Sequence, residues 1–262
     1  MRFGMNVQPS ESAAAFIASC AATGINDIRL NLSDSDPADH LLSSIRENAA
    51  KAYLVPFRAK VTGDADPLFK ALNSDVSAVV KRYQAIASAW APEDLLGIAL
   101  PEGLHLITRR GPSKRGIRRD TLISMLKPCV RAIREQGHRV VMPVRIDDIQ
   151  GRVWEPLDFD VYDVEMMMSP RLNRSLKDEA IRQIIDESNK EVWFGRAGRL
   201  GGYIIPAVQV KALRKLKGYT RGAEIAFLWS EASNPRFQWS KSGEWFVDTL
   251  RGSLNFLNGV GT

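Results

Sequence analysis

The sequence predicts a single-domain (β/α)8 TIM barrel of the α/β class, and three observations support this fold. The chain has 262 residues, and such a barrel needs about 250. Apolar strand-like segments alternate with amphipathic helical segments along most of the chain. Most of the intervening segments are long enough for the crossovers that parallel strands require. An open doubly wound sheet is the alternative, although no G-x-G-x-x-G motif follows the first strand.

Eight short apolar segments are the predicted strands. They cover residues 2–7, 27–31, 52–59, 96–100, 139–145, 161–168, 191–194 and 224–229. Pro56 and Pro143 lie inside the third and fifth segments, where a proline removes a ladder donor and argues against a strand.

Capping residues and apolar stripes predict the helices. The first helix begins at an N-cap, Ser10, and ends at Gly24, and the next begins near Pro37. Another begins near Asp75 and ends before Pro92. The remaining helices are expected over 120–136, around 181–185, and over 208–216 and 245–257, whereas 146–160 is predicted to be a loop or a single turn.

The composition is that of a soluble globular protein, with 45% hydrophobic and 25% charged residues. No segment approaches the run of about 20 apolar residues that spans a membrane, so no membrane partner is expected. The first residues are too quickly polar for a signal peptide. We therefore expect a cytoplasmic chain, with export of a processed form as the alternative. Cys20 and Cys129 lie in apolar helical patterns and are predicted to be buried thiols.

Polar residues at the predicted strand ends are the candidates for a site, because active sites of (β/α)8 barrels form at the carboxyl ends of the strands. The residues at these ends include Asn6, Arg29, Asn31, Arg58, Glu102, His105, Arg145, Asp148, Glu165, Arg196, Trp229 and Glu231. The three histidines are scattered, without the spacing of metal ligands, and no cofactor motif appears. No metal and no cofactor are therefore expected.

A resemblance to a known family rests on five short segments that follow one another in order, one to a strand. They are GMN (4–6), GINDIRL (24–30), LGIALPEG (96–103), VWFGRAG (192–198) and FLW (227–229). Together they resemble the clan A glycoside hydrolases, which are cellulase-like (β/α)8 barrels.

The resemblance implies roles for individual residues. Glu102 matches the acid/base glutamate of the family, although Pro101 replaces the asparagine that normally precedes it. The nucleophile is a glutamate in a Gly-Glu-x-Gly setting, and here Arg196 stands in its place. Trp229 matches the aromatic platform for the sugar, or is a core residue. The family's His-x-Tyr after strand six is replaced by three methionines, 166–168.

The arginine at the nucleophile position decides the chemistry that is expected. Retaining glycosidases need two carboxyl groups about 5–5.5 Å apart, and an arginine cannot attack an anomeric carbon. If Arg196 faces Glu102, the ion pair would lower the pKa of Glu102, which is wrong for a general acid. Glu165 and Glu231 are the candidate replacement carboxylates. Glu102 could instead be a structural carboxylate held by Arg196 or Arg29.

The partner implied by the resemblance is a polysaccharide or oligosaccharide. Its candidate binding residues are Asn6, Arg29, Asn31, His105, Arg145, Arg196 and Trp229. Six positive residues and no acid lie between Arg109 and Arg119, a run that is either a solvated loop or an attraction for an anionic polymer such as an acidic exopolysaccharide. Nucleic acid is less favoured, because no aromatic residues are interleaved with the run.

Two functions follow. The first is a glycoside-hydrolase-like protein that recognises a polysaccharide and hydrolyses it with Glu102 as the proton donor. The second is a catalytically inactive pseudoglycosidase that binds a glycan or a protein partner. The sequence leaves open whether the chain is an enzyme.

Overall fold

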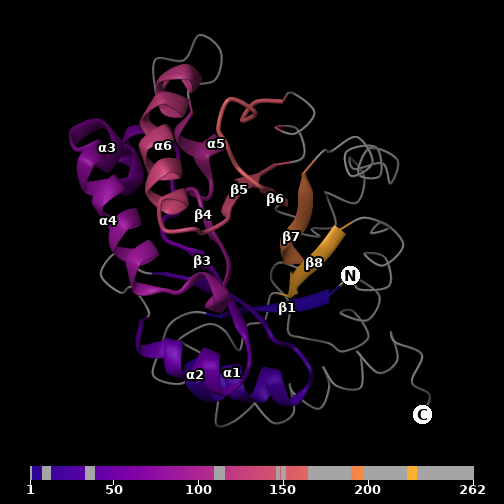
Figure 1. The fold of residues 1–262 in the computed structure, drawn as a ribbon. Helices are drawn as coiled ribbons and strands as arrows, with labels where there is room; N and C mark the ends of the chain where they lie inside the picture. Colours follow the sequence, from indigo (N-terminus) through magenta and orange to yellow (C-terminus); the bar gives the residue numbers. More distant parts are fainter. Residues whose placement is uncertain are drawn as a thin grey trace, which may run out of the picture.

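The strands form a closed parallel barrel in which each strand pairs with its neighbours in the chain and β8 pairs with β1 (Figure 1). The computed structural model describes residues 2–7, 13–32, 39–108, 116–145, 148, 152–164, 190–197 and 223–228. The strands are β1 (Arg2–Val7), β2 (Asp27–Asn31), β3 (Lys51–Val55), β4 (Leu95–Ala99), β5 (Val140–Val144), β6 (Val161–Val164), β7 (Glu191–Ala197) and β8 (Ala223–Leu228). The predicted (β/α)8 fold class is confirmed.

Helices surround the described part of the barrel, and the short α5 lies at the carboxyl end of β4. They are α1 (Ala13–Ala22), α2 (Leu42–Glu47), α3 (Pro67–Ser74), α4 (Val76–Ala89), α5 (Leu104–Ile107) and α6 (Arg119–Arg134), with short 3-10 turns η1 (Asp39–Leu41), η2 (Gly63–Ala65) and η3 (Pro92–Asp94). Helices α4 and α6 pack side by side on one flank, and α1 and α2 lie together on another (Figure 1). The helices predicted around 181–185 and over 208–216 and 245–257 lie outside the described residues.

Several predicted boundaries are wrong for identifiable reasons. Strand β3 ends at Val55 because Pro56 has no N–H for the ladder. Helix α3 was not predicted; Asp66 caps it by accepting a hydrogen bond from the N–H of Leu68, with Pro67 in the first turn. Pro143, in contrast, is accommodated inside β5. Strand β6 is described only as far as Val164, so the predicted extension to residue 168 lies outside the described residues.

The cap at the end of α1 agrees with its prediction. Gly24 has a φ of +82°, a left-handed conformation that glycine adopts without a steric penalty. The N–H of Ile25 returns to the carbonyl of Cys20 at 3.0 Å, which closes the helix end. Cys20 and Cys129 are free, buried thiols, as predicted.

The strands separate two apolar layers. The outer layer packs one face of the strands against the helices and includes Met5, Ile28, Leu54 and Ile98. The inner layer fills the barrel and, among the described residues, includes Tyr53, Val55, Leu96, Ala99, Val141, Val161, Trp193, Ile225 and Phe227. Among the described residues, no helix has the length and hydrophobicity needed to cross a membrane.

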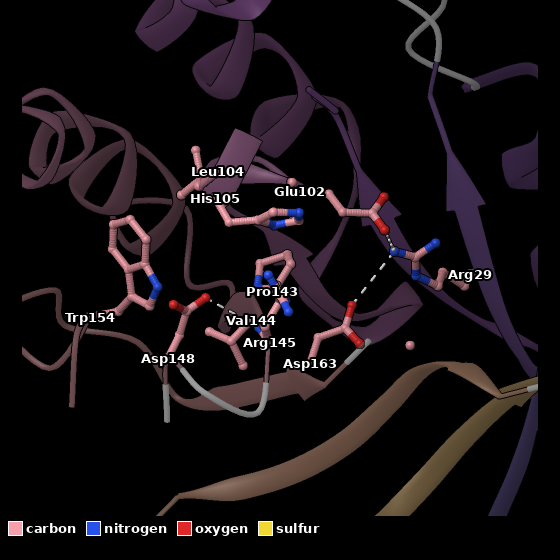
Figure 2. Close-up of a pocket in the computed structure, with 12 residues that line it drawn as sticks. Arg29, Glu102, Leu104, His105, Pro143, Val144, Arg145, Asp148, Trp154 and Asp163 are labelled. Carbon is pink, nitrogen blue, oxygen red and sulfur yellow. Dashed lines mark hydrogen bonds and ion pairs between the residues drawn. The ribbon is translucent and has the colours of Figure 1, made fainter. Parts of the chain in front are cut away.

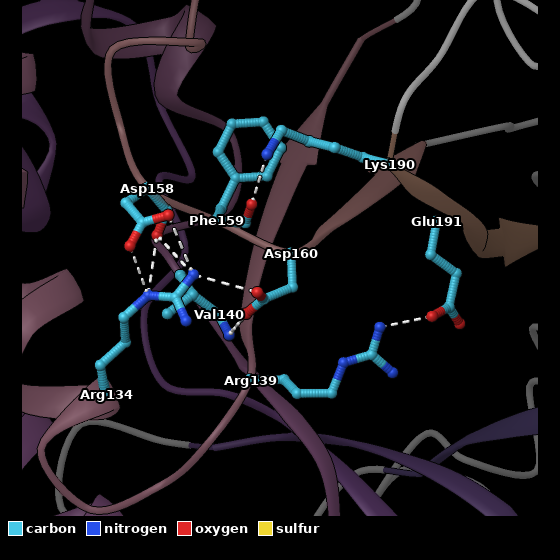
Figure 3. Close-up of polar contacts among 8 residues, drawn as sticks. All are labelled: Arg134, Arg139, Val140, Asp158, Phe159, Asp160, Lys190 and Glu191. Atoms are coloured by element: carbon cyan, nitrogen blue, oxygen red, sulfur yellow. Dashed lines mark hydrogen bonds and ion pairs between the residues drawn. The ribbon is translucent and has the colours of Figure 1, made fainter.

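Ion pairs fasten the amino-terminal ends of β5, β6 and β7 (Figure 3). Arg134 at the end of α6 contacts Asp158 at 2.8 Å and Asp160 at 3.0 Å. Arg139 pairs with Glu191 across β5 and β7. In this fold the amino-terminal end of the barrel serves stability rather than catalysis, so the site is sought at the opposite end.

Candidate functional site

A pocket opens at the carboxyl ends of β4, β5 and β6 and extends across the barrel to β2 and β7 (Figure 2). It contains about 350 Å³ of empty space, including space open to solvent. The residues that line it are Arg29, Glu102, Gly103, Leu104, His105, Pro143, Val144, Arg145, Asp148, Trp154, Asp163 and Gly195. Its position is the one that the fold predicts for an active site.

Arg29 is the centre of a buried polar network at the bottom of this pocket. Its Nη1 donates to Asn6 Oδ1 at 2.9 Å and to Asn31 Oδ1 at 2.6 Å. Its Nη2 lies 3.4 Å from Glu102 Oε1 and 3.6 Å from Asp163 Oδ2 (Figure 2). One guanidinium therefore joins two carboxylates, with only 1% of its own side chain exposed.

Strand alternation explains why a charged side chain lies so deep. Ile28 and Leu30 pack in the outer layer, so Arg29 between them points into the barrel. There its guanidinium lies 5.3 Å from the centroid of the Tyr53 ring, in a cation–π arrangement. Burial lowers the pKa of Arg29, but Glu102 and Asp163 raise it by more, so the guanidinium stays charged.

Glu102 follows β4, and both its backbone and its carboxylate are fixed by neighbouring residues. Its backbone N–H donates to the carbonyl of Phe57 at 2.9 Å, and its carbonyl accepts from Ala59 at 2.9 Å. Its carboxylate contacts Arg29 and lies 3.8 Å from Nε of the partly exposed Arg58. Only 3% of Glu102 is exposed. Of the two arginines named as alternative partners of a structural Glu102, Arg29 does contact it, whereas the role of Glu102 stays a prediction.

Asp163 is a functional candidate that the sequence reasoning missed. It lies inside β6, and Oδ2 accepts a hydrogen bond from the hydroxyl of Tyr53 at 2.5 Å. A Cβ added to Gly195 would lie 1.8 Å from Asp163 Oδ1, so only a glycine leaves room for this carboxylate. Gly195 is thus explained by its neighbour on β6, although the sequence drew attention to it through Arg196.

Tyr53, which donates to Asp163, belongs to a cluster of three aromatic rings inside the barrel. Its ring packs 5.3 Å from Trp193 and 5.4 Å from Phe227, centroid to centroid. Burial, followed by the charge of Asp163, raises the pKa of Tyr53 well above its usual value. The hydroxyl therefore remains a donor to the carboxylate.

Asn6 connects the network across the barrel. Its Oδ1 accepts from Arg29, and its Nδ2 donates to the carbonyl of Gly195 at 3.1 Å and of Phe227 at 3.4 Å. Strands β1, β2, β7 and β8 are linked by this one side chain, which is fully buried. Its role is to position Arg29 and the backbone of β7.

The remaining predicted site residues fall into two groups. His105 on α5 and Arg145 after β5 line the pocket, and Asn31 contacts Arg29 beside it. Arg196 belongs to β7, but its side chain lies outside the description, as do Glu165, Trp229 and Glu231. Whether Arg196 faces Glu102 remains a prediction.

The sequence did hold a signal for the missed residues. Asp163 interrupts the apolar segment Val161–Val164, and a charge there on an inward-facing position requires a buried partner. Tyr53 gave no such signal, because a tyrosine in an apolar strand is usually a packing residue. Trp154 was missed because it comes from the crossover after β5, which was predicted to be a loop or a single turn, whereas Asp148 in the same crossover was among the strand-end candidates.

No group of three or more potential metal ligands occurs within the part of the chain that the structure describes. The groups available for chemistry in the pocket are carboxylates, guanidiniums, an imidazole and an indole N–H. Carboxylates of this kind can transfer protons or bind hydroxyl groups.

Solved structures with the same architecture were found. The exo-β-1,4-mannosidase Op5Man5 from Opitutaceae bacterium strain TAV5 has a TM-score of 0.66 over 97% of this chain and 59% of its own, at 16% identity. A tri-modular GH5 (subfamily 4) endo-β-1,4-glucanase from Bacillus licheniformis has a TM-score of 0.63. The match covers 92% of this chain and 56% of the glucanase, at 13% identity. XacCel5A, solved in complex with cellopentaose, has a TM-score of 0.60. The match covers 87% of this chain and 88% of XacCel5A, at 11% identity.

The chain has the fold of clan A glycoside hydrolases. The predicted resemblance is therefore confirmed at the level of fold, which is what likeness at these identities shows. The chain spans 59% of the length of the mannosidase and 56% of that of the glucanase. No protein-family profile matches the sequence, and no curated protein does.

Proposed function

We propose that the chain binds a polysaccharide or oligosaccharide in this pocket and hydrolyses a glycosidic bond, with Glu102 as the proton donor. The observation that carries the proposal is the shared guanidinium, because Arg29 Nη2 contacts both Glu102 and Asp163. The distances of 3.4 and 3.6 Å limit the two carboxylate oxygens to a separation of at most about 7 Å. A second carboxylate is thus within reach, as hydrolysis requires.

The second carboxylate in this proposal is Asp163, which acts as the base. Glu102 gives its proton to the glycosidic oxygen as the C–O bond breaks, while a water attacks the anomeric carbon and gives a proton to Asp163. Asp163 is only 2% exposed and accepts from Tyr53, which suits a carboxylate acting through water better than one attacking a sugar directly. The anomeric configuration of the product is then inverted. Glu165 and Glu231 remain the alternative bases.

The test measures release of reducing ends from cellopentaose, mannopentaose and an acidic polymer by purified protein. Glu102→Gln and Asp163→Asn should each lower turnover by at least about a hundredfold, the scale of a lost acid or base. Glu93→Gln, an exposed carboxylate in η3 near the start of β4, is the matched control and should leave turnover unchanged. Wild-type rates in the Asp163→Asn variant would reject the assignment of the base.

A pseudoglycosidase that binds saccharide without turnover is the second candidate. It is favoured by the surroundings of Glu102, whose carboxylate lies 3.4 Å from Arg29 and 3.8 Å from Arg58. Neighbouring guanidiniums stabilise a charged carboxylate, whereas a general acid must carry a proton. Saccharide affinity by calorimetry, together with no product from any of the three substrates, would select this function.

A further inference from the structure

A short turn after β5, at residues 152–157, forms with Asp148 the wall of the pocket on the side away from Arg29 (Figure 2). It is anchored by Leu157 and Phe159, which are buried in the outer layer. The N–H of Leu157 donates to the carbonyl of Trp154 at 2.9 Å, and the N–H of Val153 donates to the carbonyl of Asp148 at 3.1 Å. These two backbone hydrogen bonds therefore fix the positions of Trp154 and Asp148 relative to each other.

Trp154 places an unsatisfied donor in this wall. The residue is 3% exposed, and its Nε1 finds no hydrogen-bond acceptor among the residues that the structure describes. Figure 2 shows the nitrogen on the edge of the indole that faces the pocket. A buried N–H without an acceptor is costly, and here the pocket is where an acceptor can enter.

Asp148 supplies the complementary group in the same wall. Its carboxylate lines the pocket and accepts from the backbone N–H of Arg145 at a long 3.4 Å. An indole N–H only donates and a carboxylate only accepts. A hydroxyl does both, so one or two neighbouring hydroxyl groups of a ligand can satisfy the pair together.

The charge of the pocket opposes an anionic group at this position. Among the described residues, its lining holds the guanidiniums of Arg29 and Arg145 and the carboxylates of Glu102, Asp148 and Asp163, so positive groups are not in excess there. A carboxylate on the ligand would accept from Trp154 but would be repelled by Asp148. The acidic polymer that the basic run 109–119 predicts is therefore not matched by the pocket itself.

We propose that Trp154 and Asp148 form a subsite for the hydroxyl groups of an uncharged sugar residue, in the same pocket as the Glu102–Asp163 pair but on its other side. The subsite rests on the proposed function, since it takes the ligand to be a saccharide. It adds a substrate class, because it selects neutral over acidic sugar at this position. It also holds for a binding protein without turnover.

The experiment follows indole N–H signals in the ¹H–¹⁵N spectrum of the full chain during titration with cellopentaose, mannopentaose and pentagalacturonate. The Trp154 signal, assigned from Trp154→Phe or by backbone-linked experiments, should move on addition of an uncharged pentamer. Trp90 is the matched control, because its indole is also buried and without an acceptor in the described residues but does not line the pocket. Its signal should stay in place.

Two variants add affinity measurements. Trp154→Phe and Asp148→Asn should each weaken binding of the uncharged pentamer by about tenfold, corresponding to one good polar contact, while Trp90→Phe should leave it unchanged. If the pentamer shifts other pocket signals such as the Gly195 amide but not Trp154, the subsite is rejected and the proposed function stands. The same holds if only pentagalacturonate shifts Trp154. If no saccharide shifts any signal, the proposed function is rejected and the subsite with it.

Discussion

The two faces of the strands are equally buried but depend on different interactions. On β2, Ile28 and Leu30 pack outward against helices, and Arg29 between them points inward to two carboxylates. The outer face is stabilised by removal of apolar surface from water, which any apolar residue of similar size provides. The inner face also buries apolar side chains, but in addition it contains charges that destabilise the fold if one of them loses its partner. A substitution that removes one charged residue of the inner face should therefore destabilise the fold by leaving a buried charge unpaired, which no substitution on the apolar outer face does.

The largest expected effect comes from removing the charge that the inner face shares. Arg29→Met leaves Glu102 and Asp163 buried without their common partner and should destabilise the fold by about 3–5 kcal/mol. Urea denaturation measures the change. Adding Asp163→Asn to Arg29→Met removes one of the unpaired charges and should recover part of the loss. A loss below about 1 kcal/mol would show that the network contributes little to stability.

The outer face should respond by volume alone. Leu54 is fully buried against the helices, and Leu54→Ala should cost about 2–4 kcal/mol through lost burial and a cavity. Leu54→Met, which nearly conserves volume, should cost less than about 1.5 kcal/mol. Saccharide affinity at a temperature where the variants are folded should be unchanged. A lower affinity in Leu54→Met would mean that the two faces are coupled.

Two buried tyrosines allow the faces to be compared with one chemical change. Tyr53 donates to the carboxylate of Asp163 on the inner face, and Tyr83 donates to the carbonyl of Ala99 at 3.0 Å on the outer face. Tyr53→Phe should cost about 1–3 kcal/mol and Tyr83→Phe about 1 kcal/mol, because hydrogen bonds to charged groups are the stronger. Only Tyr53→Phe should weaken binding or turnover. Equal effects of both variants on binding would contradict the proposed role of Asp163.

The same tyrosines give a pH dependence with a defined sign. Burial raises the pKa of both hydroxyls, and Asp163 adds to the effect at Tyr53. The folded chain therefore keeps protons that the unfolded chain loses above about pH 10. Their contribution to stability is complete below that pH and falls as the pH rises. Each Tyr→Phe variant should show a shallower alkaline decline of its urea midpoint than the wild type.

How much was predictable follows the same division between faces. Strand β2 was predicted at its observed bounds, because its alternation of apolar and polar residues is local information. Glu102, Arg29 and Asn6 were named as candidates from their places on or just after predicted strands, and the structure brings these three into one polar network. Asp163 was missed because its meaning depends on Tyr53 and Arg29, which lie more than a hundred residues away in the sequence. Register across the barrel brings them together, and no local pattern encodes it.

The smallest expected effect tests whether the outer layer is sealed. Burial raises the pKa of Cys20 on α1 and of Cys129 on α6 to about 12, so neither is a thiolate at neutral pH. A thiol reagent at pH 8 should label neither cysteine in the folded protein and both in urea. The Leu54→Ala variant should label slowly, at a rate set by its lower stability. Rapid labelling of the wild type would mean that the packing between helices and strands opens frequently. The outer face would then have a lower local stability than the inner face.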